Sequence, residues 1–151
     1  MPPDFFVKLI DNIPLIKYCK IEAPPTPSKI SAIRRLTGDR LILFGGLGGL
    51  FLLDELSRGA SGAMTGFAFP EILVDICRNM SEGNTHVAQE LFHRWLPLIL
   101  FEIQEGIDLS IRKSSLHYRG LIEGPTVRAP GAFADEKTLR ELTEHIENLN
   151  N

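Results

Sequence analysis

The stretch that decides the fold is Leu15-Ile-Lys-Tyr-Cys-Lys-Ile-Glu22, followed directly by Ala23-Pro-Pro-Thr-Pro27. Its first part predicts a buried β-strand over 15–22 that carries Lys20 near its exit end. Its second part predicts a proline-rich turn and then a helix that starts at Thr26, with a hydroxyl cap followed by proline at the first helical position. A strand, a short link and a helix in succession are typical of an α/β fold.

Strands and helices alternate through the first half of the chain. Strands are predicted at 15–22, 40–44 and 61–65, and helices at 3–12, 26–37, 50–58 and 70–80. Alternation through short links indicates parallel strands joined by right-handed crossovers. After Gly83 the pattern is helical only, and helices are predicted at 84–104, 109–121 and 135–149.

This change of pattern predicts two parts, a β/α part at 1–82 and a C-terminal helical extension at 83–151. Three strands make only a narrow parallel sheet, whereas a closed eight-stranded barrel takes about 250 residues. We therefore expect an α/β chain that forms the C-terminal part of a larger fold. A small stand-alone three-layer domain is the alternative.

Composition argues against several kinds of partner. The chain has 151 residues, 44% of them apolar, and a net charge of -3. Such a charge predicts no general attraction to nucleic acid or to an anionic membrane. The apolar run at 95–101 is interrupted by Pro97 and is too short to span a bilayer. Cys19 and Cys77 lie in apolar segments, which favours free thiols, and the histidines are too scattered for a zinc site. We expect a soluble cytoplasmic protein without a metal.

Strand alternation separates two lysines of the first strand. Lys20 shares one face with Glu22, and Lys17 lies on the other face with Cys19 and Ile21. If this second face meets the covering helices, Lys20 points into the interior near the carboxyl end of the strand, where α/β active sites lie. Lys20 is then either the partner of Glu22 in a structural salt bridge or a nucleophile that forms a Schiff base.

Two glycine-rich segments follow the second and third predicted strands. The backbone amides of Gly45–Gly49 could hold a phosphate or a carboxylate, or the glycines could simply allow a tight turn with close packing. The segment lacks the spacing of a dinucleotide fingerprint and the Lys-Ser/Thr of a P-loop. In the second segment, Thr65 could donate its hydroxyl to a ligand or cap the turn.

Basic residues gather in and near the predicted helix at 109–121. Arg112, Lys113 and Arg119 are the members of this group. Such residues usually form a solvated helix face, which we expect here. A role in subunit contacts is the alternative.

Three motifs at consistent spacing make the chain resemble the dihydrodipicolinate synthase/N-acetylneuraminate lyase family. They are Lys20-Ile-Glu-Ala-Pro-Pro-Thr-Pro27, Phe44-Gly-Gly-Leu-Gly-Gly49 and Arg58-Gly-Ala-Ser-Gly-Ala-Met-Thr-Gly66. The C-terminal segments, with Tyr118-Arg-Gly-Leu-Ile122, are similar to the helical tail of that family. The resemblance implies the sixth, seventh and eighth strands of a (β/α)8 barrel, preceded by the fifth helix.

The resemblance also implies a function. Family members are class I aldolases, in which a lysine on the sixth strand forms a Schiff base with pyruvate or another 2-oxo acid, and by motif position that lysine is Lys20. The substrate-binding residues implied in the same way are Gly45, Gly46, Met64 and Thr65. The expected partners are a small 2-oxo acid and further copies of the chain, as a dimer or tetramer, and no cofactor is implied.

Two parts of the family pattern have no counterpart in the chain. These are the proton-relay tyrosine of the fifth strand and the threonines after the second strand. Because they are absent, we expect weak or no turnover from this chain alone. The sequence between Lys20 and Pro27 also differs from that of the synthases, so a sugar-acid aldolase or dehydratase is an equal candidate. The alternatives to an enzyme are a non-catalytic truncated fragment or interaction domain, and a phosphate-binding module that uses Gly45–Gly49.

Overall fold

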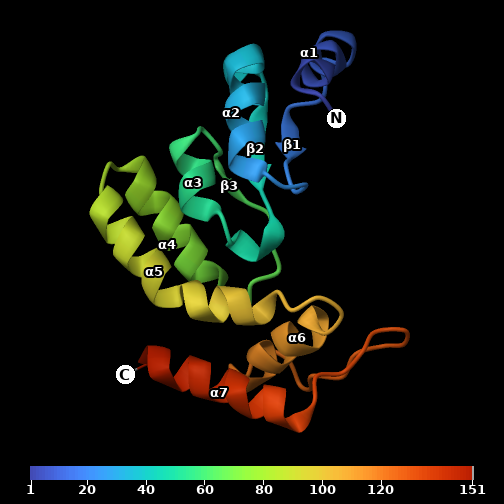
Figure 1. Ribbon diagram of the computed structural model, residues 1–151, viewed down its shortest axis with the longest axis vertical. Helices are drawn as coiled ribbons and strands as arrows, with labels where there is room; N and C mark the ends of the chain where they lie inside the picture. The colour runs from blue at the N-terminus through green and yellow to red at the C-terminus, as the bar shows by residue number, and fades with distance from the viewer. Residues whose placement is uncertain (151) are drawn as a thin grey trace.

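The computed structural model describes residues 1–150, and of Asn150 only the backbone. The elements in chain order are α1 (Pro3–Asn12), β1 (Tyr18–Lys20), α2 (Thr26–Thr37), η1 (Gly38–Arg40), β2 (Ile42–Gly45), η2 (Leu47–Gly49), α3 (Leu52–Ser57), β3 (Gly62–Ala63), α4 (Pro70–Ser81), α5 (Thr85–Glu102), α6 (Asp108–Tyr118) and α7 (Glu136–Asn150). This order confirms the predicted β/α alternation followed by helices alone (Figure 1).

The three strands form one parallel sheet in the order β1-β2-β3. Lys20 is level with Phe44, and Phe44 is level with Gly62. Because the strands are parallel and in this register, their carboxyl ends meet at one edge of the sheet. The residues predicted to carry chemistry end the strands or follow them directly at that edge.

The strands are shorter than predicted. The expected strand over 15–22 is a strand only at Tyr18–Lys20, with ladder hydrogen bonds that reach the Lys17 carbonyl and the Ile21 amide. Before it the chain turns, and the amide of Ile16 donates to the carbonyl of Ile13 at 3.0 Å. Leu15 is 90% exposed as a result and lies outside the paired strand. At β3 the ladder continues past the assigned strand, since the Met64 amide donates to the Gly45 carbonyl.

A small core fills the space between the sheet and the first two helices. Ile21 is buried in it, and Cys19 packs against it. This confirms that the Cys19/Ile21 face of the first strand meets the helices. Its buried members are Phe6, Ile10, Ile21, Ile30, Ile33, Leu41, Leu43 and Ala60.

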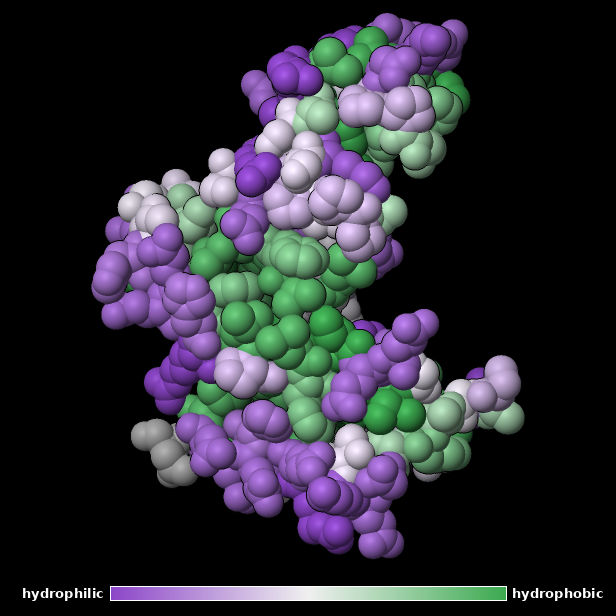
Figure 2. All heavy atoms as spheres, in the orientation of Figure 1, coloured by the Kyte–Doolittle hydropathy of each residue, from purple (hydrophilic) through white to green (hydrophobic). Residues whose placement is uncertain are grey.

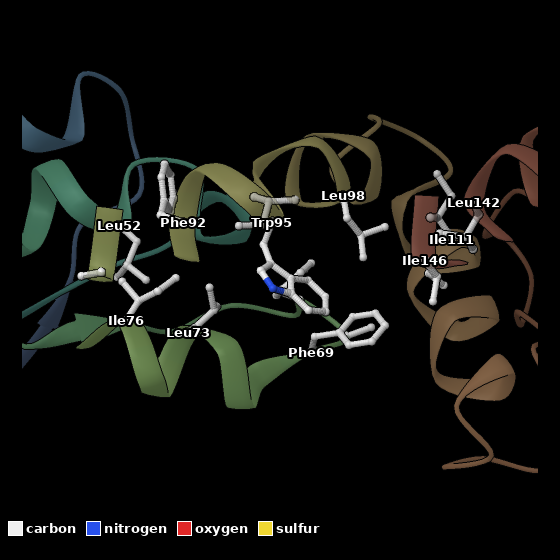
Figure 3. Close-up of a cluster of buried hydrophobic side chains, with 14 of the residues drawn as sticks. Leu52, Phe69, Leu73, Ile76, Phe92, Trp95, Leu98, Ile111, Leu142 and Ile146 are labelled. Carbon is white, nitrogen blue, oxygen red and sulfur yellow. The ribbon is translucent and has the colours of Figure 1, made fainter. Parts of the chain in front are cut away.

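A larger core joins α3 and α4 to the three C-terminal helices (Figure 3). Trp95 of α5 lies at its centre, with its ring 4.9 Å from that of Phe69 and 6.3 Å from that of Phe67. From there the core continues to Ile111 of α6 and Leu142 of α7. The C-terminal helices are therefore packed onto the β/α part through shared buried side chains. Among residues 1–150, no helix is both long enough and apolar enough to cross a membrane.

Candidate active site

A cleft of about 590 Å³ lies at the carboxyl ends of the three strands. Four segments line it, and the residues are Lys20, Glu22, Pro24, Leu47, Gly48, Leu50, Phe51, Thr65, Gly66, Ile103, Glu105, Gly106, Asp108 and Arg112. In Figure 1 these segments are the link after β1, the turn at η2, the link after β3 and the link from α5 into α6. Figure 2 shows a notch in the surface at this level, beside a gathering of hydrophobic side chains in the middle of the molecule.

Lys20 forms an ion pair with Glu22 in this cleft. Lys20 Nζ lies 2.9 Å from Glu22 Oε1, and the lysine side chain is 32% exposed. The same carboxylate oxygen accepts the backbone N–H of Leu47 at 3.3 Å. The hydrogen bond from Lys20, followed by that from Leu47, lowers the pKa of Glu22. Glu22 therefore stays ionised and ties the lysine to the glycine-rich segment.

Gly46 leaves room for this pair. A Cβ atom added at Gly46 would lie 2.6 Å from Glu22 Oε1 and 2.7 Å from Lys20 Cε. Real Cβ atoms essentially never approach other atoms so closely. The absence of a side chain at this position is thus required for Lys20 and Glu22 to lie where they do.

Gly45 faces the opposite side of the strand and contacts a buried acid. A Cβ atom added there would lie 1.6 Å from Oε2 of Glu55, whose side chain is fully buried. Glu55 Oε1 accepts the hydroxyl of Thr26 at 2.5 Å, and Oε2 has no hydrogen-bond partner among the described residues. Burial raises the pKa of Glu55. The prediction that Thr26 caps α2 was wrong: the capping position is Pro25, and the buried Thr26 hydroxyl bonds to Glu55 instead.

The structure brings together three of the five predicted site residues. Lys20 and Thr65 line the cleft, and Gly46 contacts Lys20. The Thr65 hydroxyl oxygen is buried and has no hydrogen-bond partner among the described residues. Met64 is 59% exposed and does not line the cleft, and Gly45 faces Glu55. Their roles in substrate binding remain predictions.

Arginines that were expected on a solvated helix face lie against the protein instead. Arg112 is 23% exposed in its side chain and lines the cleft. Arg119 is 22% exposed; it is paired with Glu71 at 2.6 Å and lies over the ring of Phe69. The expectation was wrong because α6 turns these long side chains towards the segment that follows β3 rather than towards water.

Two buried glutamates were not predicted from the sequence. Glu55 lies three residues after Leu52 on the core-facing side of α3, and a charged residue at such a position is a usable signal. Glu102 at the end of α5 is also fully buried; it accepts the Ala68 N–H at 3.0 Å and the Ser115 hydroxyl at 2.8 Å. Glu102 therefore links the segment after β3 to α6.

The cleft combines an amine, an ionised carboxylate, a hydroxyl and a guanidinium. An amine can attack a carbonyl carbon to form an imine, and hydroxyl and guanidinium groups can hold the oxygens of an organic acid. Within the described part of the chain, no group of three or more histidine, cysteine, aspartate or glutamate residues could hold a metal ion.

Known proteins share both the sequence pattern and this fold. Residues 3–149 match the Dihydrodipicolinate synthetase family. The chain is 32% identical over 139 residues to the L-2-keto-3-deoxyarabonate dehydratase of Azospirillum brasilense, an alignment that covers 91% of this chain and 45% of that enzyme.

Solved structures of the same family superpose closely on the chain. Dihydrodipicolinate synthase from Rhodopseudomonas palustris is 36% identical, with a TM-score of 0.91 over 97% of this chain and 50% of that one. YagE of E. coli K12, a family member solved in complex with pyruvate, is 16% identical, with a TM-score of 0.86 over 99% of this chain and 51% of that one. The chain thus spans about half the length of these relatives. It belongs to the dihydrodipicolinate synthetase family.

Proposed function

We propose that this chain supplies the imine-forming lysine of a lyase that acts on pyruvate or another 2-oxo acid. The observation that carries the proposal is the Lys20–Glu22 pair, which lies in a cleft at the carboxyl ends of parallel strands. Family membership supports the same reaction class, since the relatives include a dehydratase and a synthase. A sugar-acid dehydratase is as well supported as an aldolase, because the curated relative at 32% identity is a dehydratase.

Lys20 acts in this scheme as the nucleophile. Nζ first gives a proton to Glu22, its partner at 2.9 Å, and then attacks the carbonyl carbon of the 2-oxo acid. The carbonyl oxygen takes up one proton from the nitrogen and the proton held by Glu22 and leaves as water, and a protonated C=N⁺ bond forms. The positive nitrogen then accepts the electron pair that is released when a bond to the neighbouring carbon breaks. Glu22, held ionised beside the amine, stabilises that positive charge and fixes the direction of Nζ.

We further propose that β1, β2 and β3 are the sixth to eighth strands of a (β/α)8 barrel. The half-length match to the relatives supports this, and so does the uncovered inner face of the sheet, where Tyr18 is 64% exposed. In the described sheet β1 and β3 have free outer edges. Unpaired edges favour pairing with further strands, which fits the rest of a barrel. A homo-oligomer in the cytoplasm is proposed from the resemblance to the family alone. A fragment without its own activity, or an interaction domain, is the alternative.

Borohydride reduction in the presence of pyruvate tests the nucleophile. We expect the peptide that contains Lys20 to gain the mass of a reduced pyruvate adduct. Lys20→Ala should abolish the adduct, whereas Lys17→Ala, three residues away on the other face, should leave it unchanged. Labelling of another lysine, or no labelling in the presence of a folded chain, would contradict the assignment.

Turnover should depend on the rest of the barrel. The purified 151-residue chain is expected to show weak or no conversion of 2-oxo acids, because it has no counterpart of the proton-relay tyrosine. Joining it to the N-terminal half of the R. palustris relative should restore conversion, as measured by release of product. Robust turnover by the chain alone would refute this prediction.

Gly46→Ala is expected to reduce imine formation at Lys20 by at least about tenfold, because the new methyl group displaces both members of the ion pair. The measurement is the rate of borohydride-trapped adduct at a fixed pyruvate concentration. Gly124→Ala is the matched control, since a Cβ atom there meets nothing within 4 Å. Equal rates in the two variants would show that Gly46 does not position the lysine.

A further inference from the structure

Arg112 presents unused hydrogen-bond donors in the cleft that holds Lys20. Its Nη2 lies 3.0 Å from Oδ2 of Asp108, one turn earlier on α6. Its Nε is buried and has no partner within the described chain, and Nη1 makes no hydrogen bond there either. A guanidinium has five N–H donors in a planar fork, so the Asp108 contact leaves most of its capacity open.

The charges around Arg112 leave it available to an anion. Lys20 and Arg112 are the cations among the described residues that line the cleft. Lys20 forms an ion pair with Glu22 at 2.9 Å. Asp108, in contrast, contacts only Nη2 of the Arg112 guanidinium group. Two further acids are near: Glu105 lines the cleft but forms no ion pair with Arg112 in the described chain, and burial raises the pKa of Glu102, which weakens its competition for the arginine.

A second unpartnered group lies in the same cleft. The buried hydroxyl oxygen of Thr65 has no partner among the described residues, and the next residue, Gly66, adjoins the arginine: a Cβ atom there would lie 3.0 Å from Nη1 of Arg112. Buried polar atoms are rarely left without a partner unless a ligand supplies one.

We propose that Arg112 is a specificity-determining residue that binds a second anionic group, a carboxylate, at the far end of the 2-oxo acid attached to Lys20. This rests on the proposed function, because Lys20 fixes the near end of the substrate. Arg112 donates a charge-assisted hydrogen bond to this carboxylate through Nη1, the nitrogen that Asp108 leaves free, while Nε stays buried beside it. The preferred substrates are then 2-oxo dicarboxylic acids rather than acids with a neutral tail.

The test compares 2-oxoglutarate with 2-oxopentanoate, which has the same chain length but no second carboxylate. Borohydride trapping at Lys20 should reach half-saturation at about tenfold lower concentration for 2-oxoglutarate. Arg112→Met should remove this preference, so that the two acids reach half-saturation at the same concentration, while Asp108→Asn should strengthen the preference. Arg128→Met, which removes an exposed arginine outside the cleft, is the matched control.

A second measurement is independent of the imine. In Lys20→Ala, 2-oxoglutarate should still shift the ¹⁵N–¹H signal of Arg112 Nε in an NMR titration. An Arg112 shift without any trapping in the unmodified chain would sink the lysine assignment but support the arginine subsite. The subsite is overturned if Arg112 Nε does not shift, or if Arg112→Met weakens pyruvate and 2-oxoglutarate trapping equally.

Discussion

Gly45→Ala is expected to lower the free energy of unfolding by about 3 kcal/mol, at the upper end for overpacking a core. The new Cβ atom would lie 1.6 Å from Glu55 Oε2, and the glutamate is fully buried, so its carboxyl group has no free space to enter. Any movement also breaks the 2.5 Å hydrogen bond from Thr26. Urea denaturation of the 151-residue chain, followed by circular dichroism, measures the loss.

A double-mutant cycle with Glu55→Ala isolates the contact. Glu55→Ala alone should be destabilising, because it leaves a cavity and removes the partner of Thr26. In that background, however, Gly45→Ala should cost less than about 1 kcal/mol, because the methyl group then fills vacated space. Gly124→Ala, at an open position, should change stability by no more than about 0.5 kcal/mol. Equal costs of Gly45→Ala in both backgrounds would show that Glu55 does not make glycine necessary at this position.

Glu102→Ala is expected to destabilise the chain by about 3 kcal/mol, because it opens a buried cavity and leaves the backbone N–H of Ala68 without its acceptor. It also removes the shorter of two hydrogen bonds from the Ser115 hydroxyl, which keeps the Ile111 carbonyl as its acceptor. Glu90→Ala removes an exposed glutamate from the same helix and should change the unfolding free energy by less than about 0.5 kcal/mol. Thermal and urea unfolding of the two variants provide the comparison.

Glu102 should also make stability depend on pH in a defined direction. Burial raises its pKa above the usual glutamate value of 4.5, even though hydrogen bonds and the charges of Arg112 and Arg119 act against the rise. The folded chain therefore holds this proton more tightly than the unfolded chain does. The stability that Glu102 contributes by holding this proton is fully present below the usual glutamate pKa of 4.5. It is lost as the pH rises through the raised pKa of Glu102 in the folded chain.

Glu102→Gln tests this sign. Glutamine keeps an acceptor for Ala68 and does not titrate, so the variant should lose less stability than the unmodified chain between about pH 4.5 and pH 8. Glu55 is a second buried acid with a raised pKa, so the unfolding curves are best compared in a Glu55→Gln background. If Glu102→Gln leaves the pH dependence of stability unchanged in that background, Glu102 is excluded as its source.

Helices and strands were predicted well where residues close together in the chain determine them. Pro70 and the apolar spacing after it predict a helix at 70–80, and the structure has α4 at Pro70–Ser81. The first strand was predicted too long, because hydrophobicity at Leu15 cannot reveal that the chain is still turning before Tyr18. Pairing with β2 decides where that strand begins, and pairing depends on residues far along the chain.

The site was predicted in part for the same reason. Strand alternation put Lys20 on the face opposite Cys19 and Ile21, and in the structure Lys20 lines the cleft while Ile21 is buried against the helices. A period of two residues is a property of the strand itself, so this could be predicted locally. Strand alternation could not distinguish the roles of Gly45 and Gly46, because their neighbours Glu55 and Glu22 come from other elements.

The sequence by itself determined the order of strands and helices, the face of the first strand that carries Lys20, and the family motifs. These follow from local periodicity and from residues close together in the chain. Only the tertiary structure decided that Thr26 bonds to Glu55, 29 residues away, and that Glu102 holds Ala68, 34 residues away. It also turned Arg112 towards the cleft of Lys20. Such contacts depend on how the elements pack against one another, which no local pattern of residues specifies.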